Sequence, residues 1–308
     1  MKKTFFLIVS FLCITTFSQE KKICITIDDL PTVTYGTSNL DEEIISKFVT
    51  IFKKHQIPAI GYVNEKKLYR NNQLDSNKVK ILAKWLKNGY DLGNHTYSHF
   101  DYNKVSDSIF YNDVINGEKI IKPLMLQYGK QLKYFRHPFL HAGADSIRFN
   151  KLELFLKKNN YISAPVTFDN DDYLFAKSYH NAFINKDNDL MKYIGKEYIK
   201  YMEQKLLYFE SKSIQVFNKN IPQTLLIHAS LLNADYLGKL ADMMKRHGYT
   251  FISQEEVLQS PEYATPVTTY SERGISWIFR WGISKGVGDD LTTGNVAMPK
   301  KIIELAKQ

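Results

Sequence analysis

The sequence predicts an α/β fold with a mostly parallel sheet, either closed as a barrel or doubly wound. Seven short apolar runs have the character of strands, and the segments between them carry helical hydrophobic periodicity. The length of 308 residues suffices for one large α/β domain or two small ones. The composition, with 44% hydrophobic and 24% charged residues, is that of a globular protein.

The predicted strands are short runs of Ile, Val, Leu, Thr and aromatic residues. The two clearest read Thr-Leu-Leu-Ile-His and Tyr-Thr-Phe-Ile-Ser and are the last two of the set. The predicted strands are residues 23–28, 58–64, 90–94, 133–136, 161–168, 224–228 and 249–253.

Apolar residues at helical spacing predict the helices between these strands. We expect Asp41, Ser76 and Asn233 to be N-caps, and Gly89 and Gly248 to follow helix ends. The predicted helices are residues 41–55, 76–88, 106–127, 145–159, 189–213 and 233–247.

The first 19 residues have the pattern of a signal peptide. Lys2 and Lys3 precede an apolar run, residues 5–17, that is too short to span a bilayer. Cys13 would also fit a lipoprotein signal, although the bulky residue before it disfavours that alternative. We therefore expect an exported protein, periplasmic or secreted after cleavage, with no transmembrane span.

The mature chain divides into a main domain, residues 20–259, and a C-terminal extension, residues 260–308. The extension breaks the alternation of strands and helices, so we expect it to pack on the main domain rather than to form a second one. The net charge of +9 falls to +7 without the signal peptide. No stripe of lysine and arginine interleaved with aromatic residues is present, which argues against binding of nucleic acid.

Five of the seven predicted strands are followed by aspartate, histidine or arginine. In parallel α/β folds, ligands bind at the carboxyl ends of the strands, so these side chains are expected to form one site. They are Asp28 and Asp29 after the first strand, His95 and His99 after the third, Arg136 after the fourth, Asp169 to Asp172 after the fifth, and His228 at the end of the sixth.

Each group also has a structural interpretation that involves no site. These alternatives are a turn or helix N-cap for Asp28 and Asp29, surface or capping histidines for His95 and His99, a surface salt bridge for Arg136, a solvated loop for Asp169 to Asp172, and a core histidine for His228. The His-x-x-x-His spacing, however, brings two rings to one side of a helical turn. Two histidines and one aspartate form a three-ligand site with an open position, which is typical of catalytic zinc.

Five motifs in this order resemble those of the polysaccharide deacetylase family, the NodB homology group or carbohydrate esterase family 4. The resemblance spans about residues 22–258 and implies a distorted (β/α)7-type barrel followed by the C-terminal extension. The motifs are Thr26-Ile27-Asp28-Asp29, His95-Thr96-Tyr97-Ser98-His99, Arg136-His137-Pro138-Phe139, Asp169-Asn170-Asp171-Asp172-Tyr173 and Leu225-Leu226-Ile227-His228.

The resemblance implies a divalent metal, usually Zn²⁺, held by Asp29, His95 and His99. Asp28 would be the general base for the attacking water, and Arg136 would pair with it. We expect the two adjacent aspartates to point to different sides of their strand, which would separate these roles.

The resemblance also implies that His228 is the general acid and that Asp169 orients it. The backbone N–H of Phe139 would help to stabilise the oxyanion. Tyr173 and Ile227 would shape the pocket for the acetyl methyl group, at positions where the family usually has Trp and Leu.

The expected function is therefore that of an exported, metal-dependent hydrolase. It would remove acetyl groups from N-acetylated or O-acetylated polysaccharide or oligosaccharide. The alternative is a non-catalytic glycan-binding protein on the same fold.

Overall fold

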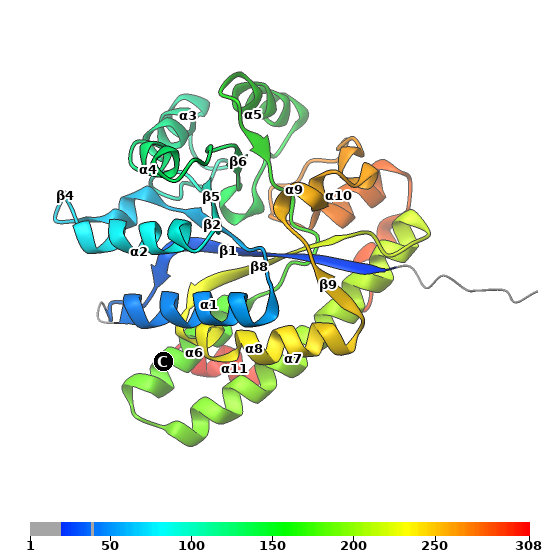
Figure 1. The fold of residues 1–308 in the computed structure, drawn as a ribbon. Coiled ribbons are helices and arrows are strands. Elements are labelled where there is room, and N and C mark those ends of the chain that lie inside the picture. The colour runs from blue at the N-terminus through cyan, green and yellow to red at the C-terminus, as the bar shows by residue number, and fades with distance from the viewer. Residues whose placement is uncertain (1–19, 38–39) are drawn as a thin grey trace, which may run out of the picture.

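The structure, a computed structural model, describes residues 20–37 and 40–308, so the predicted signal peptide lies outside the described residues. Seven parallel strands form one sheet in the order β7-β6-β5-β2-β1-β8, with β9 paired to the beginning of β1 (Figure 1). They are β1 (Lys21–Val33), β2 (Ile60–Val63), β5 (Asp91–Asn94), β6 (Tyr134–Phe135), β7 (Ile162–Ser163), β8 (Gln223–Ser230) and β9 (Tyr249–Phe251).

The sheet curls into a distorted (β/α)7-type barrel, as the sequence predicted. The chain after β7 turns back toward the opposite edge of the sheet, where Phe168 forms an isolated parallel bridge with Leu225 of β8. β7 itself has only two residues, so the predicted strand of residues 161–168 is mostly irregular chain. β7 and β8 stand at the two ends of the strand order and do not pair with each other in the described sheet.

Helices cover the outside of the sheet (Figure 1). Helices α6, α7, α8 and α11 lie together on one side, and α3, α4 and α5 lie near the edge formed by β6 and β7. The helices are α1 (Asp41–His55), α2 (Ser76–Lys87), α3 (Asp107–Asn116), α4 (Ile121–Gln127), α5 (Ser146–Lys158), α6 (Asp172–Ile184), α7 (Asn188–Phe217), α8 (Leu231–Arg246), α9 (Gln254–Leu258), α10 (Trp277–Ser284) and α11 (Lys300–Ala306).

Short elements complete the chain. A two-stranded antiparallel hairpin pairs β3 with β4. These elements are β3 (Tyr69–Arg70), β4 (Gln73–Leu74) and the 3₁₀ helices η2 (Glu65–Leu68), η3 (Pro138–Leu140), η4 (Pro261–Ala264) and η5 (Asp289–Thr292). In the described part of the chain, none of the helices has the length and apolar content needed to cross a membrane.

The predicted N-caps were each wrong by one to three positions. Asp41 is the buried first residue of α1 rather than its cap. The side chain that caps α2 belongs to Asp75, and the one that caps α8 belongs to Ser230, which accepts a hydrogen bond from the N–H of Asn233. Asn233 is fully buried inside the helix and serves the site described below.

Two other helical predictions need correction. The segment 106–127 is two helices, because α3 ends at Asn116. Its C-cap is Gly117, where an added Cβ would lie 2.6 Å from the backbone of Thr96. Helix α6 was not predicted at all. Its first turn contains Asp172, which the sequence analysis placed in the segment after the fifth predicted strand without expecting a helix there.

The C-terminal extension lies against the barrel through polar and apolar contacts. The Trp277 N–H donates to the carbonyl of Val166 at 2.8 Å, and the rings of Trp277 and Trp281 are buried. At the end of the chain, α11 packs on α6, where the Ser178 hydroxyl donates to the carbonyl of Ile302 at 3.1 Å.

Candidate active site

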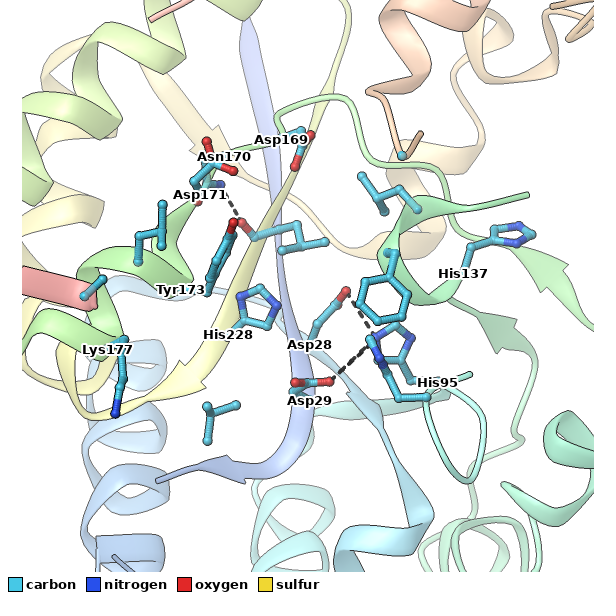
Figure 2. Close-up of a pocket in the computed structure, with 18 of the residues that line it drawn as sticks. Asp28, Asp29, His95, His137, Asp169, Asn170, Asp171, Tyr173, Lys177 and His228 are labelled. Atoms are coloured by element: carbon cyan, nitrogen blue, oxygen red, sulfur yellow. Dashed lines mark hydrogen bonds and ion pairs between the residues drawn. The ribbon is translucent and has the colours of Figure 1, made fainter. Parts of the chain in front are cut away.

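A cavity of about 700 Å³ opens at the carboxyl ends of the strands (Figure 2). Most of the side chains predicted from sequence meet there. Those that line it are Asp28, Asp29, His95, His99, Phe139, Asp169, Tyr173 and His228. Arg136 is fully buried behind the wall, and Ile227 does not reach the cavity.

β1 continues to Val33, beyond the predicted end at residue 28, and an irregularity inside it turns both aspartates toward the cavity. Asp29 has a left-handed backbone with φ of 67°, and the pairing of β1 with both neighbours shifts register beyond Asp28. The expectation that the two side chains point to different sides was therefore wrong, because it assumed a regular strand. Left-handed backbone in a non-glycine residue is costly and occurs often at functional sites.

Asp29, His95 and His99 form the predicted cluster. Asp29 Oδ1 lies 3.8 Å from Nε2 of each histidine, and the three ligand atoms all lie within 4.8 Å of one another. A tetrahedral zinc with bonds of about 2.0–2.2 Å separates its ligand atoms by roughly 3.4 Å. Asp29 Oδ1 is buried and has no hydrogen-bond partner in the described chain, so the set fits a small cation.

His95 is prepared to act as a neutral nitrogen ligand. Its Nδ1–H donates to the carbonyl of Arg136 at 2.8 Å, which leaves the Nε2 lone pair facing the aspartates. Burial lowers the pKa of His95 well below its usual value, so the ring carries no charge. A fixed hydrogen bond on the far nitrogen is the common way in which proteins orient a metal-binding histidine.

The two histidines do not share a helical turn, contrary to the interpretation of their spacing. They follow β5 in a loop in which Thr96 and His99 both have left-handed backbone, with φ of 66° and 58°. The His99 N–H donates to the Thr96 hydroxyl oxygen at 2.9 Å, which closes this turn. The loop thus brings the ring centres of His95 and His99 to 4.8 Å from each other.

Lys67 is a site residue that sequence reasoning missed. Its ammonium group donates to the Asp29 carbonyl at 3.1 Å and lies 3.2 Å from Asp29 Oδ2. Burial raises the pKa of Asp29, but Lys67 and the nearby histidines outweigh it and hold that pKa below its usual range. Asp29 is therefore a carboxylate with one oxygen bound by Lys67 and the other facing His95 and His99.

The side chain of Asp28 is more deeply buried than that of Asp29. Asp28 is 1% exposed, and its Oδ2 lies 4.0 Å from Nε of Arg136. The guanidinium of Arg136 stacks on Tyr62 at 4.5 Å from the ring centre and donates to the Thr26 hydroxyl at 2.9 Å. Burial raises the pKa of Asp28 to about 6, although Arg136 opposes the shift. A carboxylate with a pKa near neutrality is suited to exchange a proton with water.

His228 lies across Asp28 from His95, at the end of β8 (Figure 2). The carboxylate that orients it belongs to Asp172, which accepts from His228 Nδ1 at 2.7 Å and from its backbone N–H at 2.9 Å. Asn233 donates to the same carboxylate at 2.6 Å and accepts from the Tyr198 hydroxyl at 2.6 Å. Although burial opposes it, Asp172 raises the pKa of His228 to about 9.

This contact corrects the role expected for Asp169. Asp169 lines the cavity, but the bond to His228 comes from Asp172, three residues further on at the start of α6. The unpredicted helix explains the error. Its first turn places Asp172 fully buried under β8, whereas the same sequence read as a loop gives no reason to prefer one aspartate.

We predict that Asp172→Asn lowers the pKa of His228 in the metal-free protein from about 9 toward its ordinary value, because the carboxylate that stabilises the imidazolium is lost. Titration of the His228 ring by NMR measures this shift. Asp169→Asn is the matched control and is expected to leave that titration nearly in place. An equal shift in both variants would contradict the assignment to Asp172.

The apolar wall of the cavity also differs by one residue from the prediction. Along β8, side chains alternate between two faces. Leu226 lines the cavity with His228, whereas Ile227 faces the opposite side and lies in the main core. Tyr173 lines the cavity as expected and is half exposed.

The Phe139 loop completes the wall. The ring of Phe139 lies 4.5 Å from that of His99. Two histidines of the loop face partners outside the cluster: His137 Nε2 lies 3.1 Å from the Ser163 hydroxyl, and His141 Nδ1 lies 2.6 Å from an Asp101 carboxylate oxygen.

The fold and site define a class of protein, a parallel α/β barrel with two histidines and paired carboxylates at the carboxyl ends of its strands. Residues 17–152 match the family model of polysaccharide deacetylases. This match covers less than half of the chain and agrees with the family that the motifs predicted. The match includes the Asp29, His95 and His99 cluster and ends before His228.

Two curated proteins resemble part of the chain. Two peptidoglycan-N-acetylglucosamine deacetylases from Bacillus cereus are each 30% identical over 121 residues, which is 39% of this chain and 37% and 47% of theirs. The chain thus matches less than half the length of these curated relatives.

Solved structures share the fold. The polysaccharide deacetylase Bc1974 from Bacillus cereus has a TM-score of 0.52 at 14% identity, covering 76% of this chain and 92% of its own. A mutant of BA3943, a CE4 family pseudoenzyme from Bacillus anthracis, has a TM-score of 0.51 at 15% identity, covering 78% and 68%. At these identities the likeness concerns the fold alone.

Proposed function

We propose that this protein is an exported hydrolase that uses a divalent metal, zinc by its ligand types, to remove acetyl groups from a glycan. The proposal rests on one arrangement of side chains. The cavity holds the Asp29, His95 and His99 cluster, whose Asp29 Oδ1 has no hydrogen-bond partner among the described residues, with the buried carboxylate of Asp28 beside it and His228, hydrogen-bonded to Asp172, on the other side. Export rests on the predicted signal peptide, residues 1–19.

Asp29, His95 and His99 would hold the metal. When bound, the metal would supply Lewis acidity to the acetyl carbonyl and lower the pKa of water. Asp28 lies beside the cluster, with Oδ2 3.8 Å from His95 Nε2, and would accept a proton from the attacking water. Arg136 accompanies Asp28 at 4.0 Å and limits the rise in its pKa.

His228 is placed to return a proton to the leaving group. An amine leaves an acetamide only with a proton, and a histidine held as imidazolium by Asp172 can supply it. With its Nδ1–H committed to Asp172, the proton available for transfer is on Nε2. The backbone N–H of Phe139 is our candidate for the oxyanion donor, because its loop forms the cavity wall next to His99.

A non-catalytic glycan-binding protein is the alternative function. The fold does not exclude it, since a structural neighbour with a TM-score of 0.51 is described as a pseudoenzyme. The acid and base groups favour an enzyme, because Asp28 and His228 have pKa values shifted to about 6 and about 9 by a buried site that glycan binding alone does not require.

Acetate release from a panel of glycans tests the activity and its substrate. We expect the zinc-loaded protein to release acetate from peptidoglycan fragments or chitooligosaccharides, since the matching relatives are named for peptidoglycan. Acetylxylan separates ester from amide cleavage. Binding to one of these glycans without acetate release from any would favour the glycan-binding alternative.

A further inference from the structure

The C-terminal extension contributes directly to the catalytic cavity. Gly274 lines the cavity next to Phe139 and Leu140. Helix α10 follows, and its Trp277 packs in an apolar cluster with Leu140 and with Leu226 of the cavity wall. The extension therefore touches the same loop that carries the candidate oxyanion donor.

Gly274 lies against the backbone of this loop. A Cβ added at Gly274 would lie 1.8 Å from the carbonyl oxygen of Phe139 and 2.9 Å from its carbonyl carbon. Both atoms belong to the main chain, so a side chain cannot simply rotate away. Any residue larger than glycine at this position must displace the Phe139 backbone or the extension itself.

Arg280 holds the next residue of the loop. Its Nη2 donates to the carbonyl of Leu140 at 3.1 Å, and the guanidinium lies 5.0 Å from the ring centre of Trp277. Arg280 is fully buried, and Nε and Nη1 find no hydrogen-bond partner in the described chain. A buried cation is costly unless it is paired, so the cost suggests that its contact with the loop matters.

The loop needs external support. Phe139 and Leu140 are consecutive non-glycine residues with left-handed backbone, both with φ of 56°. Such conformations cost of order 1–3 kcal/mol each and persist where the surroundings enforce them. The extension is itself fixed on the barrel, because the Ser276 hydroxyl donates to the carbonyl of Thr167 at 2.7 Å.

We propose that Gly274 and Arg280 are positioning residues that hold the Phe139 and Leu140 backbone where the cavity needs it. The role in catalysis rests on the proposed deacetylase function. The extension would thus set the position of the oxyanion donor, while the ligand cluster of Asp29, His95 and His99 forms without it.

Gly274→Ala tests the close contact. Removing an oxyanion donor outright lowers kcat by about 10²–10³-fold, and we expect a displaced donor to lower it by about tenfold or more. KM and the dissociation constant for zinc should change less than about twofold, because the ligand cluster is untouched. Gly288→Ala is the control. Gly288 lies in the same extension, and a Cβ added there has no described atom within 4 Å. Equal kcat in the two variants would overturn the proposal.

Arg280 provides a second pair of variants. Arg280→Met keeps the length and apolar stem but loses the donor to Leu140, whereas Arg280→Lys keeps an N–H donor. We expect the lysine variant to retain more of the kcat than the methionine variant at similar thermal stability. Losses of kcat that follow only the stability of each variant would show a merely structural role.

Hydrogen exchange separates this proposal from the proposed function. The N–H groups of Leu140 and His141 donate within the loop to the carbonyls of His137 and Pro138, both at 3.0 Å. Their exchange should quicken in Gly274→Ala and Arg280→Met but not in Gly288→Ala. Unchanged exchange would refute the positioning role, whether or not the wild-type protein releases acetate. A wild-type protein that releases none, with exchange altered as expected, would refute only the deacetylase function.

Discussion

Asp28→Asn is expected to lower acetate release by about 10²–10⁴-fold, the usual contribution of a general base. Asparagine has nearly the same shape as aspartate but cannot take a proton from water. The position is buried and lies 3.8 Å from His95 through one carboxylate oxygen, so a change of shape would confuse the result. The measurement is the initial rate of acetate release by zinc-loaded protein.

Zinc affinity is the control for this variant. Asp28 is not a member of the ligand cluster, so the dissociation constant for zinc should stay within about tenfold of the wild-type value. A tenfold loss of metal affinity is about the smallest effect usually seen when a residue that supports the ligands is removed. Full activity in Asp28→Asn would show that another group activates the water. A complete loss of zinc would move Asp28 into the ligand set.

His95→Ala is expected to abolish zinc binding at micromolar zinc and, with it, acetate release. The substitution removes one of three ligands. Loss of a residue that only hydrogen-bonds to a ligand already lowers metal affinity by about 10–100-fold. Equilibrium dialysis with elemental analysis measures the bound zinc. His99→Ala is a second variant, since His99 is less buried than His95 and its loss disturbs the core less.

His247→Ala is the matched control for both histidine variants. His247 follows α8 and bonds to Glu203 at 2.7 Å, outside the cavity. We expect the His247→Ala variant and the wild-type protein each to bind one zinc per chain. If His95→Ala and His99→Ala both retain zinc with wild-type affinity, the metal is held elsewhere and the ligand assignment is wrong.

The sequence was most informative where a buried parallel strand ends. Apolar residues on both faces predicted β1 and β8, and the polar residues that follow had to lie at one edge of the sheet. That argument needs only the alternation of strands and helices. It brought Asp28, His95 and His228 to one cavity without knowledge of any contact.

Contacts that depend on local backbone or on distant segments were not predictable in the same way. Aspartate adopts left-handed backbone more readily than most residues, but its residue type does not distinguish Asp29 from the other aspartates of the chain. Asp169 and Asp172 stand in one acidic run, and only the first turn of α6 selects the second. Leu226 and Ile227 differ by one position, which reverses the face of a strand.

The contribution of the C-terminal extension illustrates the same limit at long range. Gly274 is one of 15 glycines in the chain, and the reason for it is a backbone carbonyl of Phe139, 135 positions away. Lys67 likewise contacts Asp29 from a 3₁₀ helix that the hydrophobic periodicity of the sequence did not predict. Such residues become visible only when the fold places them.

We propose that removal of acetyl groups requires a metal held at the carboxyl ends of the strands. The most direct test follows acetate release by the wild-type protein before chelation, after chelation with removal of the metal verified by elemental analysis, and after addition of zinc. We predict that the protein releases acetate before chelation, releases none after the metal is removed, and recovers its activity when zinc is added. Undiminished release from metal-free protein would contradict the claim.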